Sequence, residues 1–182
     1  MHTIFLVVGE SGSGKDSLIN MTCNEIGLKQ LKSYTTRPRR ENEHDTHVFI
    51  SPDDVEQYKN DIIAYTKIGA YEYFATKSQL NDADLYAIDY EGLKYLRDVM
   101  SNNDNLRFVI IYINVPRKIR EERATTVRGD DQLTFYRRCF NEEVQFNEML
   151  VKRDFDYMIT NRNLNTSYHI FKQIVLEERH YD

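Results

Sequence analysis

The sequence has few cysteines, no excess of positive charge and no long apolar run. Its two cysteines, Cys23 and Cys139, both fall in segments that we expect to be helical, which favours free thiols in a reducing compartment. Lys and Arg number 24 against 29 Asp and Glu, a net charge of −5 that argues against broad nucleic-acid binding. No apolar stretch approaches the ~20 residues of a membrane span, and the N-terminal apolar run is too short for a signal peptide. We therefore expect a cytoplasmic protein that binds neither nucleic acid nor a membrane.

Strand-like and helix-like segments alternate along the 182 residues, a length that suits one domain with a substantial core. Apolar, β-branched runs predict strands, and apolar residues at helical spacing predict helices. The expected strands cover residues 4–8, 28–33, 62–66, 71–75, 85–88, 107–115 and 157–160. The expected helices cover residues 15–26, 52–60, 93–100, 117–126, 131–152 and 167–178. The alternation predicts an α/β fold with a mostly parallel sheet, and the two strands joined around Gly69 predict an antiparallel pair in a small inserted subdomain.

A glycine-rich loop follows the first strand and opens the first helix. It reads Gly9, Glu10, Ser11, Gly12, Ser13, Gly14, Lys15, Asp16 and Ser17. Strand, loop and helix in this order match a phosphate-binding loop, in which backbone N–H groups cradle phosphates and a lysine reaches the terminal ones. The plain alternative is a Gly/Ser turn that joins a strand to a helix. The flanking context favours the phosphate loop, and therefore a nucleotide such as ATP.

Asp16 departs from the usual pattern, which has Ser or Thr after the lysine to hold magnesium. A carboxylate can also hold Mg2+ directly or through water, and Ser17 offers a hydroxyl one residue later. Asp89, at the end of a predicted core strand, is a third candidate. It can organise magnesium or an acceptor hydroxyl, or it can be only the N-cap of the next helix.

A second phosphate-binding pattern follows the second strand. It reads Ser33-Tyr34-Thr35-Thr36-Arg37-Pro38-Arg39-Arg40 within a polar segment, 34–46, that we expect to be a loop. Guanidinium groups bind phosphate oxygens in a bidentate way, so these side chains can surround one phosphate dianion. A solvated basic turn is the alternative, and the preceding phosphate loop makes it the weaker one.

With these motifs the sequence resembles the guanylate kinase family along nearly its whole length. The resemblance rests on the phosphate loop, on the S-x-T-T-R-x-x-R pattern and on Asp45-Thr46-His47-Val48-Phe49-Ile50-Ser51. It implies a three-layer P-loop kinase fold with a parallel core sheet (1–33, 80–115 and 153–182), an inserted acceptor-binding subdomain (34–79) and a helical lid (116–152). By resemblance, the acceptor's phosphate is held by Ser33, Arg37, Arg40 and His47, the last of which replaces a tyrosine.

The resemblance also implies a lid that brings arginines to the migrating phosphoryl group. Arg123, Arg128 and one of Arg137 and Arg138 match this lid, and the choice between the last two stays open. Arginines that a closing lid delivers act by position and charge, because phosphoryl transfer spreads negative charge over the group. Some of them can instead be exposed helix charges paired with nearby glutamates. Asn161 and Arg162 fall where the family packs the adenine ring.

The positions that read guanine differ from the family. Guanine presents an N1–H and an exocyclic amine, for which the family supplies two acids, but the matching positions here are Ala64 and Ala87. Thr76 keeps the hydroxyl of another substrate-binding motif. Ribose 1,5-bisphosphate kinase, a relative in the same superfamily, also resembles the chain in Gly-Lys-Asp-Ser and lacks the guanine-reading acids.

The sequence therefore predicts an ATP- and Mg2+-dependent phosphotransferase whose acceptor is a nucleoside monophosphate, GMP by family. The alternatives are a sugar-phosphate acceptor and a catalytically silent binding module. Intact Lys15 and loop glycines make the silent module the weaker of the two. The sequence leaves the oligomeric state unknown.

Overall fold

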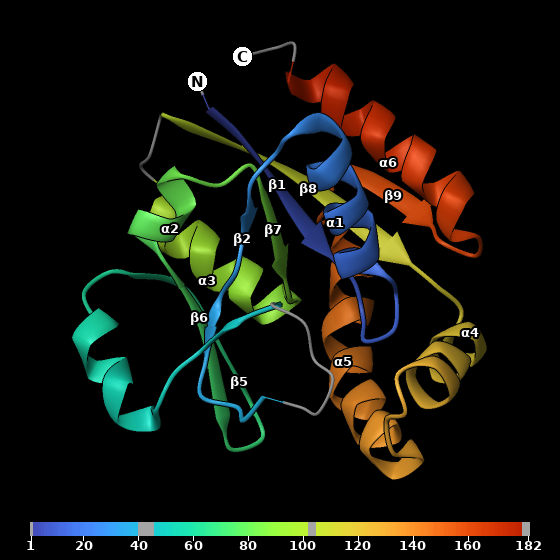
Figure 1. The fold of residues 1–182 in the computed structure, drawn as a ribbon, viewed down its shortest axis with the longest axis horizontal. Coiled ribbons are helices and arrows are strands. Elements are labelled where there is room, and N and C mark those ends of the chain that lie inside the picture. Colours follow the sequence, from blue (N-terminus) through green and yellow to red (C-terminus); the bar gives the residue numbers. More distant parts are fainter. Residues whose placement is uncertain (1, 40–45, 102–104, 180–182) are drawn as a thin grey trace.

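The computed structural model describes residues 2–39, 46–101 and 105–179, and its centre is a five-stranded parallel sheet (Figure 1). The strands are β1 (His2–Val8), β2 (Gln30–Leu31), β7 (Leu85–Ile88), β8 (Leu106–Asn114) and β9 (Tyr157–Thr160), in the order β2-β7-β1-β8-β9. The central strand β1 is therefore flanked by β7 and β8. The predicted parallel α/β sheet is confirmed.

Helices cover both faces of this sheet and make it the middle of three layers. On one face, α1 (Lys15–Ile26) and α6 (Leu164–Arg179) pack against Phe5 and Val7 of β1. On the other, α3 (Tyr90–Met100) and α5 (Gln132–Lys152) pack against Ile4, Leu6 and Val8. Because successive side chains of a strand point to opposite faces, the apolar run of β1 serves both cores.

A second, four-stranded sheet carries the segment expected to be the inserted subdomain. Its strands β3 (Tyr34–Thr35), β4 (Val48–Phe49), β5 (Ile62–Ile68) and β6 (Tyr71–Thr76) lie in the order β4-β3-β6-β5. The predicted antiparallel pair, β5 with β6, is confirmed. The expectation that 34–46 is entirely loop was wrong, because Tyr34 and Thr35 pair with β6 and β4, which no local pattern reveals.

Short helices connect these strands. The 3-10 helix η1 (Pro52–Tyr58) begins at the predicted N-cap Ser51 with its capping box, and α2 (Lys77–Asn81) follows β6 directly. The helix expected over 117–126 is an α-helix only to Glu122, as α4 (Arg117–Glu122), and continues as one π-helical turn, η2 (Arg123–Val127). This wider turn carries Arg123, which contacts the glycine-rich loop.

Several predicted boundaries shift by a few residues, and two of these shifts have a clear cause. The second strand was expected over 28–33, but only Gln30 and Leu31 pair with β7. The last helix starts at Leu164 and not at 167, because the side chain of Asn163 accepts a hydrogen bond from the N–H of Thr166 and caps an additional turn. Both cysteines are free thiols in helices, as expected. Among the helices described, none is long and apolar enough to cross a membrane.

Candidate active site

The carboxyl ends of the core strands meet at one edge of the sheet. Val8, the last residue of β1, pairs with Ile88 of β7 and Tyr112 of β8, and Asn114 pairs with Thr160 of β9. The residues that follow these strands are therefore neighbours, and they include Gly9, Asp89 and Asn161. In open α/β sheets, ligands bind at this edge, where the connections on either side of one strand run in opposite directions.

The glycine-rich loop has the backbone of an anion-binding turn. Gly12 and Gly14 have φ values of 81° and 89°, and Gly14 is the N-cap of α1. Space also demands glycine: a Cβ atom on Gly12 would lie 2.7 Å from the carbonyl oxygen of Arg120, and one on Gly14 would lie 2.6 Å from Asn161 Nδ2. Lys15 Nζ donates to the Gly9 carbonyl at 2.5 Å, so its ammonium stays within the loop.

Two buried polar atoms beside the loop lack protein partners. Asn161 donates through Nδ2 to the carbonyl oxygen of Ser13 at 2.8 Å, but its Oδ1 and the Ser13 hydroxyl have no hydrogen-bond partner among the described residues. A buried polar atom without a partner costs about 1–3 kcal/mol. Arg123 reaches the same place, with bonds to the Ser13 carbonyl at 3.4 Å and the Asn161 carbonyl at 3.0 Å. The structure thus brings together the glycine-rich loop, the helical segment α4–η2 and the residue that follows β9.

Helix α5 contacts the loop through an acid that sequence reasoning missed. The Glu142 carboxylate accepts hydrogen bonds from the Ser11 N–H at 3.0 Å and from the Ser11 hydroxyl at 2.6 Å. Arg120, which is buried, donates to the Ser11 carbonyl at 3.3 Å and lies 3.6 Å from Glu10 and 3.8 Å from Glu142. Helical spacing could have indicated that Glu142 faces the protein: it falls three residues after buried Cys139 and four before buried Phe146, on the apolar face of α5.

The three candidate magnesium ligands differ in exposure. Asp16 and Ser17 are exposed in the first turn of α1, while Asp89 is partly buried and caps α3, its carboxylate accepting from the Gly92 N–H at 2.7 Å. Burial raises the pKa of Asp89, although hydrogen bonds from Gly92 and Thr66 and the nearby charge of Lys15 oppose the rise. The N-cap interpretation of Asp89 is confirmed. No group of three His, Cys, Asp or Glu suited to a metal occurs in the described ranges, so protein side chains alone do not form a cage there.

A second cluster, at β3 and β4, gathers the predicted acceptor-phosphate residues. The Ser33 hydroxyl and His47 Nδ1 lie 3.0 Å apart, and Arg37 Nε donates to the Tyr73 hydroxyl at 3.1 Å. The His47 ring packs edge-on against Tyr73, with ring centres 5.6 Å apart. Tyr73, on β6, was not predicted; nothing in its local sequence separates it from a structural strand residue. Arg40 lies outside the described residues.

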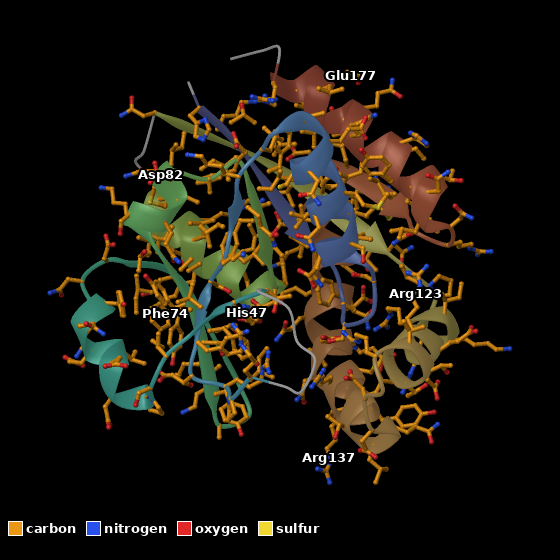
Figure 2. The ribbon with its side chains drawn as sticks, in the orientation of Figure 1. His47, Phe74, Asp82, Arg123, Arg137 and Glu177 are labelled. Atoms are coloured by element: carbon orange, nitrogen blue, oxygen red, sulfur yellow. The ribbon has the colours of Figure 1, made fainter. Side chains whose placement is uncertain are left out.

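The arginines predicted to belong to a lid separate into two groups. Arg128 and Arg138 converge on Asp130, with nitrogen to oxygen distances of 2.7 and 3.4 Å. Arg137 is exposed, and Figure 2 shows it near the N-terminal end of α5 at the edge of the molecule, whereas Arg123 lies directly after α4. The open choice between Arg137 and Arg138 is thus one between an exposed and a half-buried side chain.

The remaining predicted residues make packing, helix-capping or backbone contacts within the protein. Ala64 is buried in the core, and Ala87 packs partly buried against the opposite face. Thr76 is buried, and its hydroxyl caps α2 by accepting from the Gln79 N–H at 3.4 Å. Arg162 is exposed after β9, and its carbonyl accepts from Arg123 at 3.4 Å.

Comparisons with known proteins agree with this geometry. The family model described as guanylate kinase matches residues 1–178. The guanylate kinase of Buchnera aphidicola subsp. Baizongia pistaciae is 31% identical over 175 residues, 89% of this chain and 81% of that protein. That of Blochmanniella floridana is 27% identical and covers 96% and 86%. The crystal structure of guanylate kinase from Anaplasma phagocytophilum has a TM-score of 0.67 at 18% identity, over 97% of this chain and 86% of that one, and so supports the fold.

Proposed function

Because the chain belongs to the guanylate kinase family, we propose that it transfers the γ-phosphoryl group of ATP to the phosphate of GMP. Family membership makes the chain an ATP-dependent nucleoside monophosphate kinase. GMP as the preferred acceptor, and the residue roles below, are our proposal. The observation that carries it is the pair of phosphate-binding clusters: a loop with its lysine at the end of β1 and a Ser33–His47–Arg37 cluster on the second sheet.

The loop binds the nucleotide phosphates. Lys15 exchanges its bond to the Gly9 carbonyl for phosphate oxygens, and the N–H groups at the start of α1 add donors and a partial positive charge. The unpartnered Ser13 and Asn161 side-chain oxygens gain donors or water when the site fills. Asp16, Ser17 and Asp89 offer the oxygen atoms that Mg2+ prefers, and they fit an ion held mainly by phosphates, as Mg2+ usually is. Bound Mg2+ would neutralise charge on the β- and γ-phosphates.

The acceptor cluster orients the second phosphate. Arg37 supplies a planar guanidinium that donates through Nε to the Tyr73 hydroxyl and through Nη1 to the Pro38 carbonyl at 2.8 Å, and a bound phosphate would compete with these acceptors for its donors. Ser33 and His47, which directly precede the neighbouring strands β3 and β4, contribute polar side chains. Arg40 belongs to this set by family resemblance.

The lid supplies charge to the migrating group. Arg123 already bonds to the loop, and Arg128 and Arg138 share Asp130, from which they can be released as ligand charge arrives. We assign the transfer role to Arg138 and not to Arg137, because Arg137 is on the exposed side of α5. No covalent intermediate is needed, since positioning and charge supply the catalysis.

Ala64 and Ala87 predict weak discrimination between GMP and IMP, which lacks the exocyclic amine. A hydrogen bond to a charged group contributes about 1.5–3 kcal/mol, so one missing carboxylate is expected to lower the preference for GMP by about 10- to 100-fold. Ala87→Asp should raise the GMP to IMP ratio of kcat/KM at least about tenfold. Ala70→Asp, in the exposed turn between β5 and β6, adds the same charge as a control and should leave the ratio unchanged.

The test is a coupled assay of ATP consumption with GMP, IMP, AMP, pyrimidine monophosphates and ribose phosphates. GMP is expected to give the highest kcat/KM, followed closely by IMP. A ribose phosphate in first place would replace the acceptor that we propose. If ATP were consumed no faster with any of these acceptors than without one, the kinase function would be refuted and a silent binding module favoured. Lys15→Ala should abolish both ATP binding and turnover, and retention of both would refute the role of the loop.

A further inference from the structure

Ser11, in the glycine-rich loop, has its N–H, its hydroxyl and its carbonyl all bound by side chains of two helices. The N–H donates to both oxygen atoms of the Glu142 carboxylate, at 3.0 and 3.1 Å, and the hydroxyl donates to one of them at 2.6 Å. The carbonyl accepts from Arg120 at 3.3 Å. Glu142 is on α5 and Arg120 is on α4, so the conformation of the loop at Ser11 depends on where these two helices lie.

The bond from Ser11 to Glu142 fixes a peptide unit whose other end faces the loop lysine. The Ser11 N–H and the Glu10 carbonyl belong to one planar, trans peptide group, so they point in opposite directions. The Glu10 carbonyl accepts from the Ser13 N–H at 3.0 Å and from Lys15 Nζ at 3.5 Å. Glu142 thus holds one end of the unit, and donors of the loop itself bind the other. A rotation of the unit would take this carbonyl away from both Lys15 and Ser13.

The charges around Glu142 suit a partner of the loop. The buried Arg120 guanidinium lies 3.8 Å from the Glu142 carboxylate and 3.6 Å from that of Glu10, and it compensates their negative charge. Glu10 also accepts from the Tyr112 hydroxyl of β8 at 3.1 Å, which ties the same part of the loop to the core sheet. A carboxylate accepts from an N–H and an O–H with both of its oxygen atoms, whereas an amide offers only one acceptor oxygen.

Helix α5 is fixed at the point where it carries Glu142. Cys139 and Phe146, which lie three positions before and four after it, are buried in the protein. Core packing therefore sets the position of the Glu142 backbone, and the side chain transmits that position to Ser11. Glu143, the next residue, is exposed.

We infer that Glu142 is a positioning residue for ATP, which orients the Glu10–Ser11 peptide unit and, through the Glu10 carbonyl, places Lys15. The inference rests on the proposed role of Lys15 in binding the ATP phosphates. Donors that are already in position need no rearrangement when charge arrives or develops. Loss of Glu142 should therefore weaken ATP binding and slow phosphoryl transfer. It should leave the KM for the acceptor unchanged, because the acceptor cluster is on the other sheet.

Calorimetric titration with ATP, without an acceptor, tests the inference. Glu142→Ala should weaken ATP binding at least about tenfold, the equivalent of one hydrogen bond to a charged group. Glu143→Ala is the matched control and should bind ATP as the wild type does. In steady-state kinetics Glu142→Ala should raise the KM for ATP and lower kcat without changing the KM for the acceptor. ATP binding equal to that of the wild type, or an equal rise in both KM values, would overturn the proposal.

Two conservative substitutions separate hydrogen-bond geometry from charge. Glu142→Gln keeps the length of the side chain and one acceptor oxygen, whereas Glu142→Asp keeps the charge but is one methylene shorter. A side chain that positions the loop must reach Ser11, so the Gln variant should retain more ATP affinity than the Asp variant. Urea unfolding checks that each variant is folded. Wild-type affinity in Glu142→Asp, together with a Gln variant as weak as Glu142→Ala, would show that Glu142 acts by charge and not by position.

A double-mutant cycle tests the contact itself. Ser11→Ala removes the hydroxyl that donates to Glu142, so its loss of ATP affinity should largely disappear when Glu142 is already alanine. Losses that simply add would refute the contact as the route. Lys15→Ala separates this inference from the proposed function. Retained ATP binding in Lys15→Ala would refute the role of the lysine, whereas loss of binding there and unchanged binding in Glu142→Ala would refute only the role of Glu142.

Discussion

Gly12 is a position at which the phosphate loop and helix α4 directly constrain each other, and Gly12→Ala should expose that constraint. Its φ of 81° is in the left-handed region, which costs an alanine about 1–2 kcal/mol. The new Cβ atom would also lie 2.7 Å from the Arg120 carbonyl oxygen. That oxygen accepts the N–H of Arg123, so it cannot move without disturbing the start of η2.

Gly27 provides a matched control. It caps α1 with a φ of 72°, but a Cβ atom there meets nothing within 4 Å. Gly27→Ala should therefore lower the free energy of unfolding by only the conformational cost, about 1–2 kcal/mol. Gly12→Ala should lower it by a further 1–3 kcal/mol or so, the usual effect of overpacking.

Urea unfolding monitored by far-UV circular dichroism measures the loss of stability, and calorimetric titration with ATP measures the loss of ATP affinity. We expect Gly12→Ala to weaken ATP binding at least tenfold, about 1.4 kcal/mol, because Arg120 also bonds to the loop at Ser11. Gly27→Ala should bind ATP as wild type does. If both variants lose the same stability and bind ATP equally, contact between loop and α4 does not set the loop conformation, and the reasoning is wrong.

Three further predictions concern single side chains. Glu142→Gln should raise the KM for ATP several-fold in steady-state kinetics, because Glu142 holds the phosphate loop, whereas exposed Glu143→Gln should not. Hydrogen bonding from Tyr157, and then from Arg107, lowers the pKa of Glu178, so its contribution to stability is present above the unfolded-state pKa and is lost as pH falls through the folded-state pKa. The difference in unfolding free energy between wild type and Glu178→Gln should therefore shrink in acid, and a difference that stays constant with pH would contradict this linkage. Burial raises the pKa of Cys23 to about 11, so iodoacetamide should modify this thiol slowly at pH 8 in the native protein and quickly in urea.

The local sequence pattern was sufficient to predict an element where that element is long or has a clear boundary signal. The bounds of α1 and β9 and the N-caps Ser51 and Asp89 follow from apolar spacing and side-chain chemistry alone. The two-residue strands β3 and β4 could not be predicted, and β2 was predicted too long, because pairing with distant strands defines all three. The same reason explains why Tyr73 was missed: its contact with Arg37 spans 36 residues and depends on the register of β3 with β6.

Helix phase resolves part of what sequence spacing left open in α5. Arg137 and Arg138 are adjacent, so no spacing argument separates them, yet a rotation of about 100° places Arg137 in solvent and Arg138 next to Asp130. The same rotation directs Glu142 to the phosphate loop and leaves Glu143 in solvent. Because a rigid helix moves as a unit, a displacement of α5 that moves Arg138 would also move Glu142 and the phosphate loop that it holds.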